Sequence, residues 1–137
     1  MKILQINTVY KEKSTGRICF EVNKALEKQG HNGFIAYGKG KHRDKNAYRI
    51  ESDIEYYFHN VMARITGLQG YFSFFATKRL IKYIKNISPD IIHLQNLHAN
   101  YLHLPQLFKF LKKSGIPVIL TLHDCWAFTG KCPHYTD

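Results

Sequence analysis

The chain has 137 residues, 45% of them hydrophobic and 14% aromatic, so it is long and apolar enough to fold around one packed core. Twenty Lys and Arg against ten Asp and Glu give a net charge of +10, which indicates an anionic partner such as a phosphate, a nucleic acid or lipid headgroups. No apolar stretch approaches the roughly 20 residues that span a bilayer, and the polar start MKILQINTVYKEK is unlike a secretion signal, which predicts a cytoplasmic protein.

The first third of the chain predicts strand, helix and strand. Residues 2–9 are apolar and β-branched, as in a buried strand. A turn at 14–16 then precedes a helix over 17–30, whose apolar residues recur at helical spacing: Ile18, Val22, Ala25 and Leu26. A second buried strand is predicted over 33–38, and a basic loop separates it from a short strand near 48–50.

Two helices are predicted next, each from apolar residues at steps of three and four: Ile54, Phe58, Val61, Ile65 and Leu68 in the first, and Phe72, Phe75, Leu80, Tyr83, Ile84 and Ile87 in the second. A strand over 90–97 follows. The next helix ends at 114, before Gly115, with four residues expected inward: Leu104, Leu107, Phe108 and Leu111. The last strand is predicted over 116–122.

This alternation predicts an α/β fold, a Rossmann-like doubly wound and mainly parallel sheet with helices on both faces. Ligands of such sheets bind beyond the carboxyl ends of the strands. The residues that follow the predicted strands are therefore candidates for a common rim: Ser14 to Arg17, Tyr37 to Lys39, Asn96 to His98, and His123 to Cys125.

Two nucleotide-binding motifs are missing from the sequence. The first strand is not followed by G-x-G-x-x-G, and no G-x-x-x-x-G-K-[ST] occurs, which excludes an ordinary dinucleotide site and a P-loop. Thr15, Gly16 and Arg17 could still offer backbone N–H groups, a helix dipole and a full charge to an anion. The alternative is a helix cap with a solvated arginine.

Cysteine and histidine residues gather at the end of the chain. Cys125, Cys132 and His134 do not have the spacing of a zinc site, and no second pair follows them. Cys19 is expected to be a small buried residue, and His93 a hydrogen-bonded histidine inside a strand. We therefore expect no metal and no disulfide scaffold.

The segment 71–87 combines an aromatic face with Lys78, Lys82 and Lys85. This pattern is typical of a helix on an anionic membrane surface, and also of a packed helix with a solvated lysine face. The basic loop GKGKHRDK could add attraction to lipid or nucleic acid.

Two segments resemble glycosyltransferase family 4, whose members build bacterial capsular and exopolysaccharides. They are HLQNLHANYL (residues 93–102) and, above all, TLHDCWAFTGKC (residues 121–132). The resemblance runs through the whole chain. It implies the GT-B architecture, two Rossmann-like domains facing each other across a cleft, with residues 1–137 as the acceptor-side domain. The donor-binding C-terminal domain, with its E-x7-E motif, is absent, so the chain is expected to be a truncated half that is inactive alone.

The resemblance also implies roles for individual residues. Thr15, Gly16 and Arg17 would bind the donor phosphates, and His98 and His123 would be catalytic. Gln95, Asn96, Asp124 and Trp126 would bind the acceptor, a glycan or a lipid-linked molecule. Relatives often carry a histidine where this chain has Gln95, and a glutamine cannot carry a proton.

The reaction implied by this resemblance is transfer from a nucleotide-sugar with retention of anomeric configuration, without a metal or other cofactor. Lipid-linked acceptors also make attachment to the inner face of the membrane an expectation. A different class of function remains open: a free-standing Rossmann-like module that uses its positive charge to bind a nucleotide or nucleic acid. The sequence has no base-reading motif that would support it.

Overall fold

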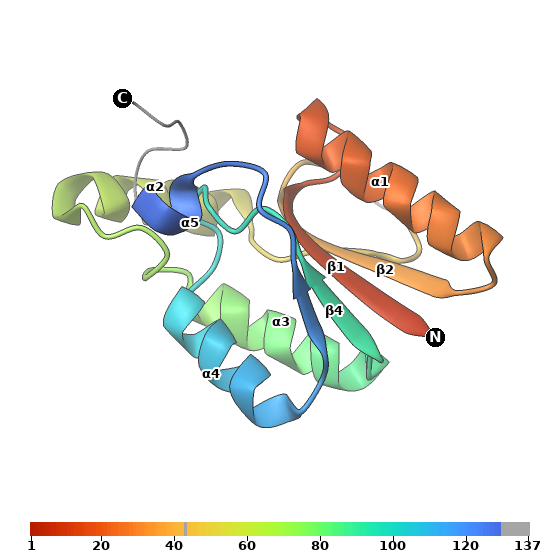
Figure 1. The fold of residues 1–137 in the computed structure, drawn as a ribbon. Helices are drawn as coiled ribbons and strands as arrows, with labels where there is room; N and C mark the ends of the chain where they lie inside the picture. The colour runs from red at the N-terminus through yellow and green to blue at the C-terminus, as the bar shows by residue number, and fades with distance from the viewer. Residues whose placement is uncertain (43, 130–137) are drawn as a thin grey trace.

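The computed structural model describes residues 1–42 and 44–129, and their strands form one parallel sheet (Figure 1). The strand order is β3-β2-β1-β4-β5. The strands are β1 (Lys2–Val9), β2 (Asn32–Lys39), β3 (Ala47–Arg49), β4 (Ile91–Leu94) and β5 (Val118–Leu120). This order confirms the predicted Rossmann-like fold, and its direction reverses between β1 and β4, where such sheets hold their ligands.

Helices lie on both faces of the sheet (Figure 1). Helix α1 (Lys13–Lys28) covers one face, and α3 (Phe74–Ile87) and α4 (Leu104–Ser114) cover the other. Helix α2 (Asp53–Thr66) connects the β3 edge to α3, and α5 (Trp126–Thr129) is a single turn after β5.

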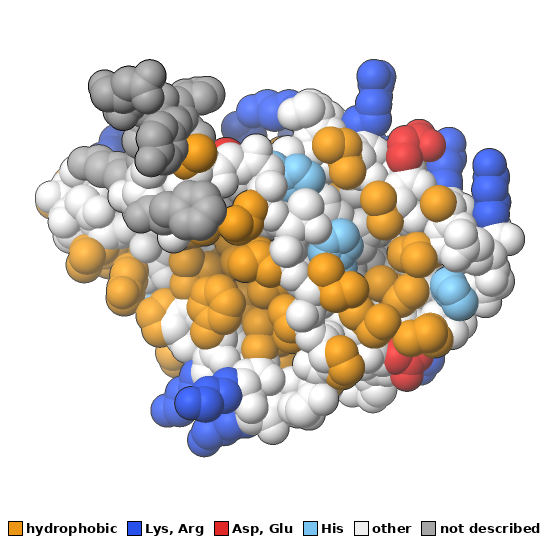
Figure 2. Space-filling view, viewed as in Figure 1, with side chains coloured by type: hydrophobic (Ala, Val, Ile, Leu, Met, Phe, Trp, Pro, Cys, Tyr) orange, Lys and Arg blue, Asp and Glu red, His pale blue; other side chains and the backbone are white. Residues whose placement is uncertain are grey.

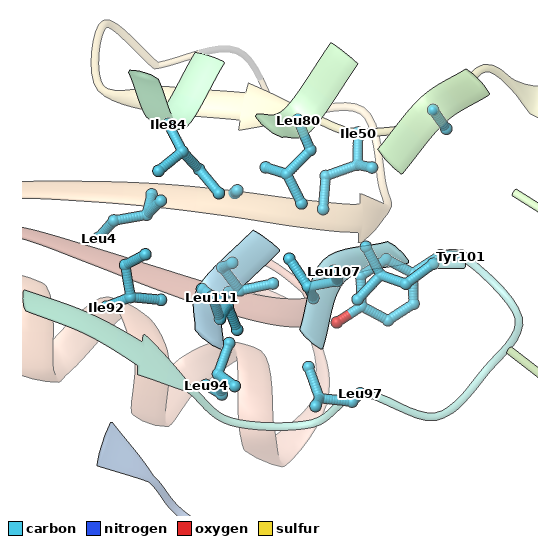
Figure 3. Packing of buried hydrophobic residues seen from close by; sticks show 14 residues of the cluster. Leu4, Ile50, Leu80, Ile84, Ile92, Leu94, Leu97, Tyr101, Leu107 and Leu111 are labelled. Atoms are coloured by element: carbon cyan, nitrogen blue, oxygen red, sulfur yellow. The ribbon is translucent and has the colours of Figure 1, made fainter. Parts of the chain in front are cut away.

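The main core lies between the sheet and the pair α3 and α4 (Figure 3). Leu4 and Ile92 come from the strands, Leu80 and Ile84 from α3, and Leu107 from α4; each is fully buried. A smaller cluster lies under α1: Tyr10, Cys19, Ile35 and Tyr37. Cys19 is thus the buried residue that the sequence predicts.

Helix α1 begins four residues earlier than predicted, at Lys13. The predicted turn at 14–16 is instead the first helical turn, because the chain bends sooner, at Lys11, which has a φ of +60° and donates its N–H to the Gly16 carbonyl. A Cβ on Gly16 would lie 3.1 Å from Cγ2 of Val9, so the helix packs tightly against the end of β1. Ile18, expected on the apolar face, is exposed.

The last two strands are shorter than predicted, and β5 is half-exposed. Residues 95–103 and 121–125 are loops at the carboxyl ends of β4 and β5. Side chains of Val118, Ile119 and Leu120 are 42–51% exposed, since β5 is the edge strand of the sheet. Phe108 of α4, expected inward, is also half-exposed and faces the loop after β5.

Helix α2 turns its apolar row toward solvent. Only His59 and Ala63 are buried on this helix, whereas Ile54, Phe58 and Ile65 are among its exposed residues. At 100° per residue the two sets lie on opposite sides of the helix. The sequence pattern therefore predicts the helix correctly. An amphipathic helix ordinarily packs its apolar row against the core, but in α2 this row faces solvent.

A buried polar cluster joins α2 to the start of α3. The Ser73 hydroxyl donates to Oε1 of Glu51 and contacts Nδ1 of His59. All three side chains are nearly or fully buried. Burial raises the pKa of Glu51 to about 7, and burial together with the nearby His103 lowers the pKa of His59 to about 4.

Candidate functional site

The loops that follow β1, β4 and β5 meet at one edge of the sheet. Oγ1 of Thr8, near the end of β1, lies 3.0 Å from the carbonyl oxygens of both Asn96 and His98. The Tyr101 hydroxyl donates to the same Asn96 carbonyl at 2.7 Å, and the Asn96 N–H donates to Oδ1 of Asn7. These bonds fix the loop after β4 to the end of β1.

A pocket of about 180 Å³ opens between this loop, α4, β5 and α5. It gathers six residues singled out in the sequence: Gln95, Asn96, His98, His123, Asp124 and Trp126. Its other walls are mainly apolar, from Leu97, Leu104, Phe108, Leu120, Leu122 and Ala127. Figure 2 shows the hydrophobic side chains that gather between α4 and α5 and along β5 on this side of the molecule.

His98 and Asp124 form a hydrogen-bonded pair at the pocket. Nε2 of His98 lies 2.7 Å from Oδ2 of Asp124, and the other carboxylate oxygen accepts the backbone N–H of Trp126 at 3.0 Å. The Trp126 ring lies beside the His98 ring, with 6.0 Å between centroids, and its Nε1–H donates to Gln69. The pair is about three-quarters buried, so it is partly protected from solvent.

His123 is held by a chain of buried amides. Its Nε2 lies 3.3 Å from Oε1 of Gln95, and Nε2 of Gln95 donates to Oε1 of Gln5 at 2.5 Å. Gln5 then donates to the Cys19 carbonyl of α1. Gln95 therefore lies in the floor of the pocket with an exposure of 3%, supporting His123 from below.

His93 lies on β4, close to this chain. Its Nε2 hydrogen-bonds with Oγ1 of Thr121 at 2.8 Å, which confirms the predicted hydrogen-bonded strand histidine. Burial, and then the neighbouring His123, lower the pKa of His93.

The three predicted phosphate-binding residues lie apart from the pocket, at the third to fifth positions of α1. Gly16 is buried, Thr15 half-buried and Arg17 exposed. The N-cap residue Glu12 makes no side-chain cap, and the first turn carries no acidic residue, so its N–H groups and the helix dipole favour an anion. These residues follow β1 and therefore share the pocket's edge of the sheet.

Several residues of this edge were not singled out in the sequence. Gln5 and Asn7 support the loop after β4 from within β1, and Gln69 holds the Trp126 ring. The only available signal was polar residues inside an otherwise apolar strand, KILQINTV. Gln69 gave no signal, since it is 57 residues from its partner.

Residues 1–42 and 44–129 contain no group of three or more His, Cys, Asp or Glu side chains placed to hold a metal ion. His103 instead caps α4, accepting the N–H of Gln106. Cys125 is a free, half-buried thiol. Cys132 and His134 lie outside the described residues.

Comparison with known proteins gives two matches. Residues 15–136 match the model of Glycosyltransferase Family 4. The whole chain is also similar, at 25% identity, to a protein of Escherichia coli strain K12 whose name describes it as a candidate colanic acid biosynthesis glycosyl transferase, WcaC. The chain spans 36% of the length of that relative.

Proposed function

Because this chain belongs to glycosyltransferase family 4, we propose that it is the acceptor-side domain of a retaining glycosyltransferase of bacterial surface-polysaccharide synthesis. The enzyme moves a sugar from a nucleotide-sugar to a glycan or lipid-linked acceptor. The observation that carries the proposal is the pocket at the ends of β4 and β5, where His98, His123 and Asp124 meet an apolar wall.

The two histidines face the group that reacts. An acceptor hydroxyl must lose its proton as it attacks the sugar, and an imidazole within hydrogen-bond reach assists this step. Asp124 orients His98 by accepting a hydrogen bond from its Nε2. Trp126 and Asn96 offer a ring face and an amide, the groups that bind the apolar face and the hydroxyls of a sugar.

The departing nucleoside diphosphate is the anionic partner that the charge of +10 indicates. Thr15 offers it a backbone N–H of the uncapped first turn of α1, and Arg17 a guanidinium group, beside the buried Gly16. Such fixed donors stabilise the negative charge that develops on the leaving group, so no metal or further cofactor is required in this mechanism.

Most of the donor is held by a second domain, so the 137-residue chain is inactive alone. The test is a transfer assay with a panel of nucleotide-sugars, run on the complete protein and on this chain. We expect transfer by the complete protein only. Transfer by the 137-residue chain alone contradicts the proposal that a second domain holds most of the donor. A complete protein that transfers no sugar and binds unrelated DNA in a salt-dependent manner supports the nucleic-acid-binding alternative instead.

We propose that this enzyme contacts an anionic membrane, and that the contact lies on α2 and the start of α3 rather than along all of 71–87. Leu80 and Ile84 of that segment are buried in the core. Phe74 and Phe75, at the start of α3, are exposed, as is the outward row of α2. No helix among the described residues is long and apolar enough to cross a bilayer.

The charges around this surface favour an anionic bilayer. The acidic residues of α2 are paired with arginines, Asp53 with Arg49 and Glu55 with Arg79. Arg64 and the exposed Lys78 add positive charge without an ion pair among the described residues. An apolar row flanked by cations is the pattern of a helix that lies in the plane of a membrane surface.

Vesicle binding tests this contact. We expect the complete protein to bind phosphatidylcholine vesicles only when phosphatidylglycerol is included, and Phe58→Glu to lower the bound fraction severalfold. Ile18→Glu, an exposed apolar residue on α1, is the matched control and should bind like the unaltered protein. Equal binding by Phe58→Glu and the unaltered protein contradicts the assignment of this surface.

A further inference from the structure

The direction of each hydrogen bond from α1 to His123 is fixed by one backbone carbonyl. The Cys19 carbonyl can only accept, so the side-chain nitrogen of Gln5 must face it, and this bond is 3.1 Å long. The Gln5 oxygen then faces Gln95 and can only accept. If either amide were turned over, two oxygens or two N–H groups would face each other in a buried place.

The same reasoning extends to the imidazole ring. Gln95 uses its nitrogen for Gln5, so its oxygen faces Nε2 of His123 at 3.3 Å. An amide oxygen cannot donate, and Nε2 of His123 must therefore carry the proton. In the neutral ring the lone pair is then on Nδ1.

We propose that Gln5 and Gln95 are positioning residues that hold His123 in the Nε2–H tautomer, with Nδ1 as a hydrogen-bond acceptor for a ligand hydroxyl in the pocket. Neither glutamine needs to contact substrate for this role. Gln5 is fully buried, and it acts on His123 only through Gln95. The use of the tautomer in catalysis rests on the proposed sugar transfer, whereas the tautomer itself does not.

This arrangement restricts the chemistry of the ligand. A lone pair on Nδ1 accepts a hydrogen bond from a sugar hydroxyl but repels an oxygen of a phosphate or carboxylate. Nε2 of His98 is likewise taken by Asp124, which as a carboxylate only accepts. In both histidines Nε2 is thus the ring nitrogen that bonds to the protein, which leaves Nδ1 for a ligand. The pocket between them therefore selects a neutral, hydroxyl-bearing ligand.

Nitrogen NMR of the imidazole rings tests the proposal directly. The chain is prepared with ¹⁵N-labelled histidine and studied at a pH above the ordinary imidazole pKa of about 6.5, where neutral tautomers are resolved. We expect the resonances of His123 to show a protonated Nε2 and an unprotonated Nδ1. A proton on Nδ1 overturns the proposal without the need for any variant.

Two variants test the chain of amides behind the ring. Gln95→Leu removes the acceptor, and Gln5→Leu removes the group that orients Gln95; each should give His123 a mixture of tautomers. Gln69→Leu is the matched control, since it changes a glutamine that contacts the pocket residue Trp126 but does not belong to the chain of amides, and it should leave the tautomer of His123 unaltered. A pure Nε2–H tautomer in folded Gln5→Leu contradicts the role of Gln5.

Kinetics of the complete protein separate the two hypotheses. If sugar transfer is confirmed, Gln5→Leu should lower kcat roughly tenfold, with little change in KM. The loss is smaller than the roughly 10²–10⁴-fold that acid–base assistance contributes, because part of His123 keeps the correct tautomer. An Nε2–H tautomer of His123 without any sugar transfer refutes the proposed function but not the positioning role of the two glutamines. Sugar transfer with an Nδ1–H tautomer of His123 refutes the positioning role of the two glutamines but not the proposed function.

Discussion

His98 and Asp124 are 26 residues apart in the sequence, and their side chains meet at 2.7 Å on the wall of one pocket. One follows β4 and the other follows β5, and these strands are hydrogen-bonded neighbours in the sheet. Parallel strands end at the same edge, so residues after adjacent strands converge even when a helix separates them in the chain.

Asp124→Asn in the complete protein should lower kcat by about 10²-fold or more. The amide keeps the shape of the side chain but removes the carboxylate that orients His98. The asparagine can still accept the Trp126 N–H, and ion pairs that keep some contact with solvent contribute only about 0–1 kcal/mol, so the free energy of unfolding should fall by about 1 kcal/mol or less. Steady-state kinetics and urea unfolding measure the two effects, and an unchanged kcat removes this pair from the reaction.

Replacement of the outward row of α2 should have little effect on stability. Ile54 is 82% exposed, so Ile54→Ser should change the free energy of unfolding by less than about 0.5 kcal/mol. Leu80→Ala, in the main core, should cost about 2–5 kcal/mol. Urea unfolding of both variants makes the comparison. A loss of several kcal/mol in Ile54→Ser means that this row packs against protein.

Glu51→Gln should stabilise the protein progressively as the pH rises. The folded protein keeps the carboxyl protonated up to a pKa of about 7, whereas the unfolded chain releases the proton near 4.5. The unaltered protein therefore loses stability between these pH values, because the folded state binds more protons than the unfolded state.

A glutamine does not titrate, so the difference in unfolding free energy between Glu51→Gln and the unaltered protein should grow by about 3 kcal/mol over this range. Comparison of the two proteins at each pH cancels the opposite contribution of His59, whose lowered pKa makes stability rise with pH between about 4 and 6.5. If the unfolding free energies of the two proteins change in parallel with pH, the raised pKa of Glu51 is contradicted.

Gly38→Ala should destabilise the protein more than Gly115→Ala. A Cβ at Gly38 would lie 2.4 Å from Cγ of the buried Tyr101 ring, so β2 or the ring must move, at a cost of about 1–3 kcal/mol or more. Gly115 has open space around it and only a φ of +67°, which costs about 1 kcal/mol for alanine. Thermal unfolding of both variants checks the order, and an equal loss argues against the close contact.

Local patterns in the sequence were sufficient for most elements. Alternating apolar and helical segments predict all five strands and the long helices, and the αL glycine at Gly115 ends α4 as expected. The beginning of α1 was missed, because a positive φ at Lys11 turns the chain earlier than any capping signal indicates. A lysine is not a residue type that signals a positive φ, so the local sequence does not reveal this turn.

For the candidate site, the sequence singled out six residues that line one pocket, and the tertiary structure decided their partners. The loops after the strands and the motif TLHDCW single out His98, His123 and Asp124 before any coordinates are known. That Gln95 supports His123, and that Gln5 orients Gln95 from 90 residues away, follows only from strand order and side-chain direction.

The outward row of α2 gives the same lesson for packing. Its spacing determines a helix, because side chains three and four residues apart share one side of it. Which side meets the core depends on the buried cluster of Glu51, His59 and Ser73, which holds the opposite face inward. Periodicity is a property of the local chain, whereas burial depends on contacts between distant segments, and only the folded structure contains those contacts.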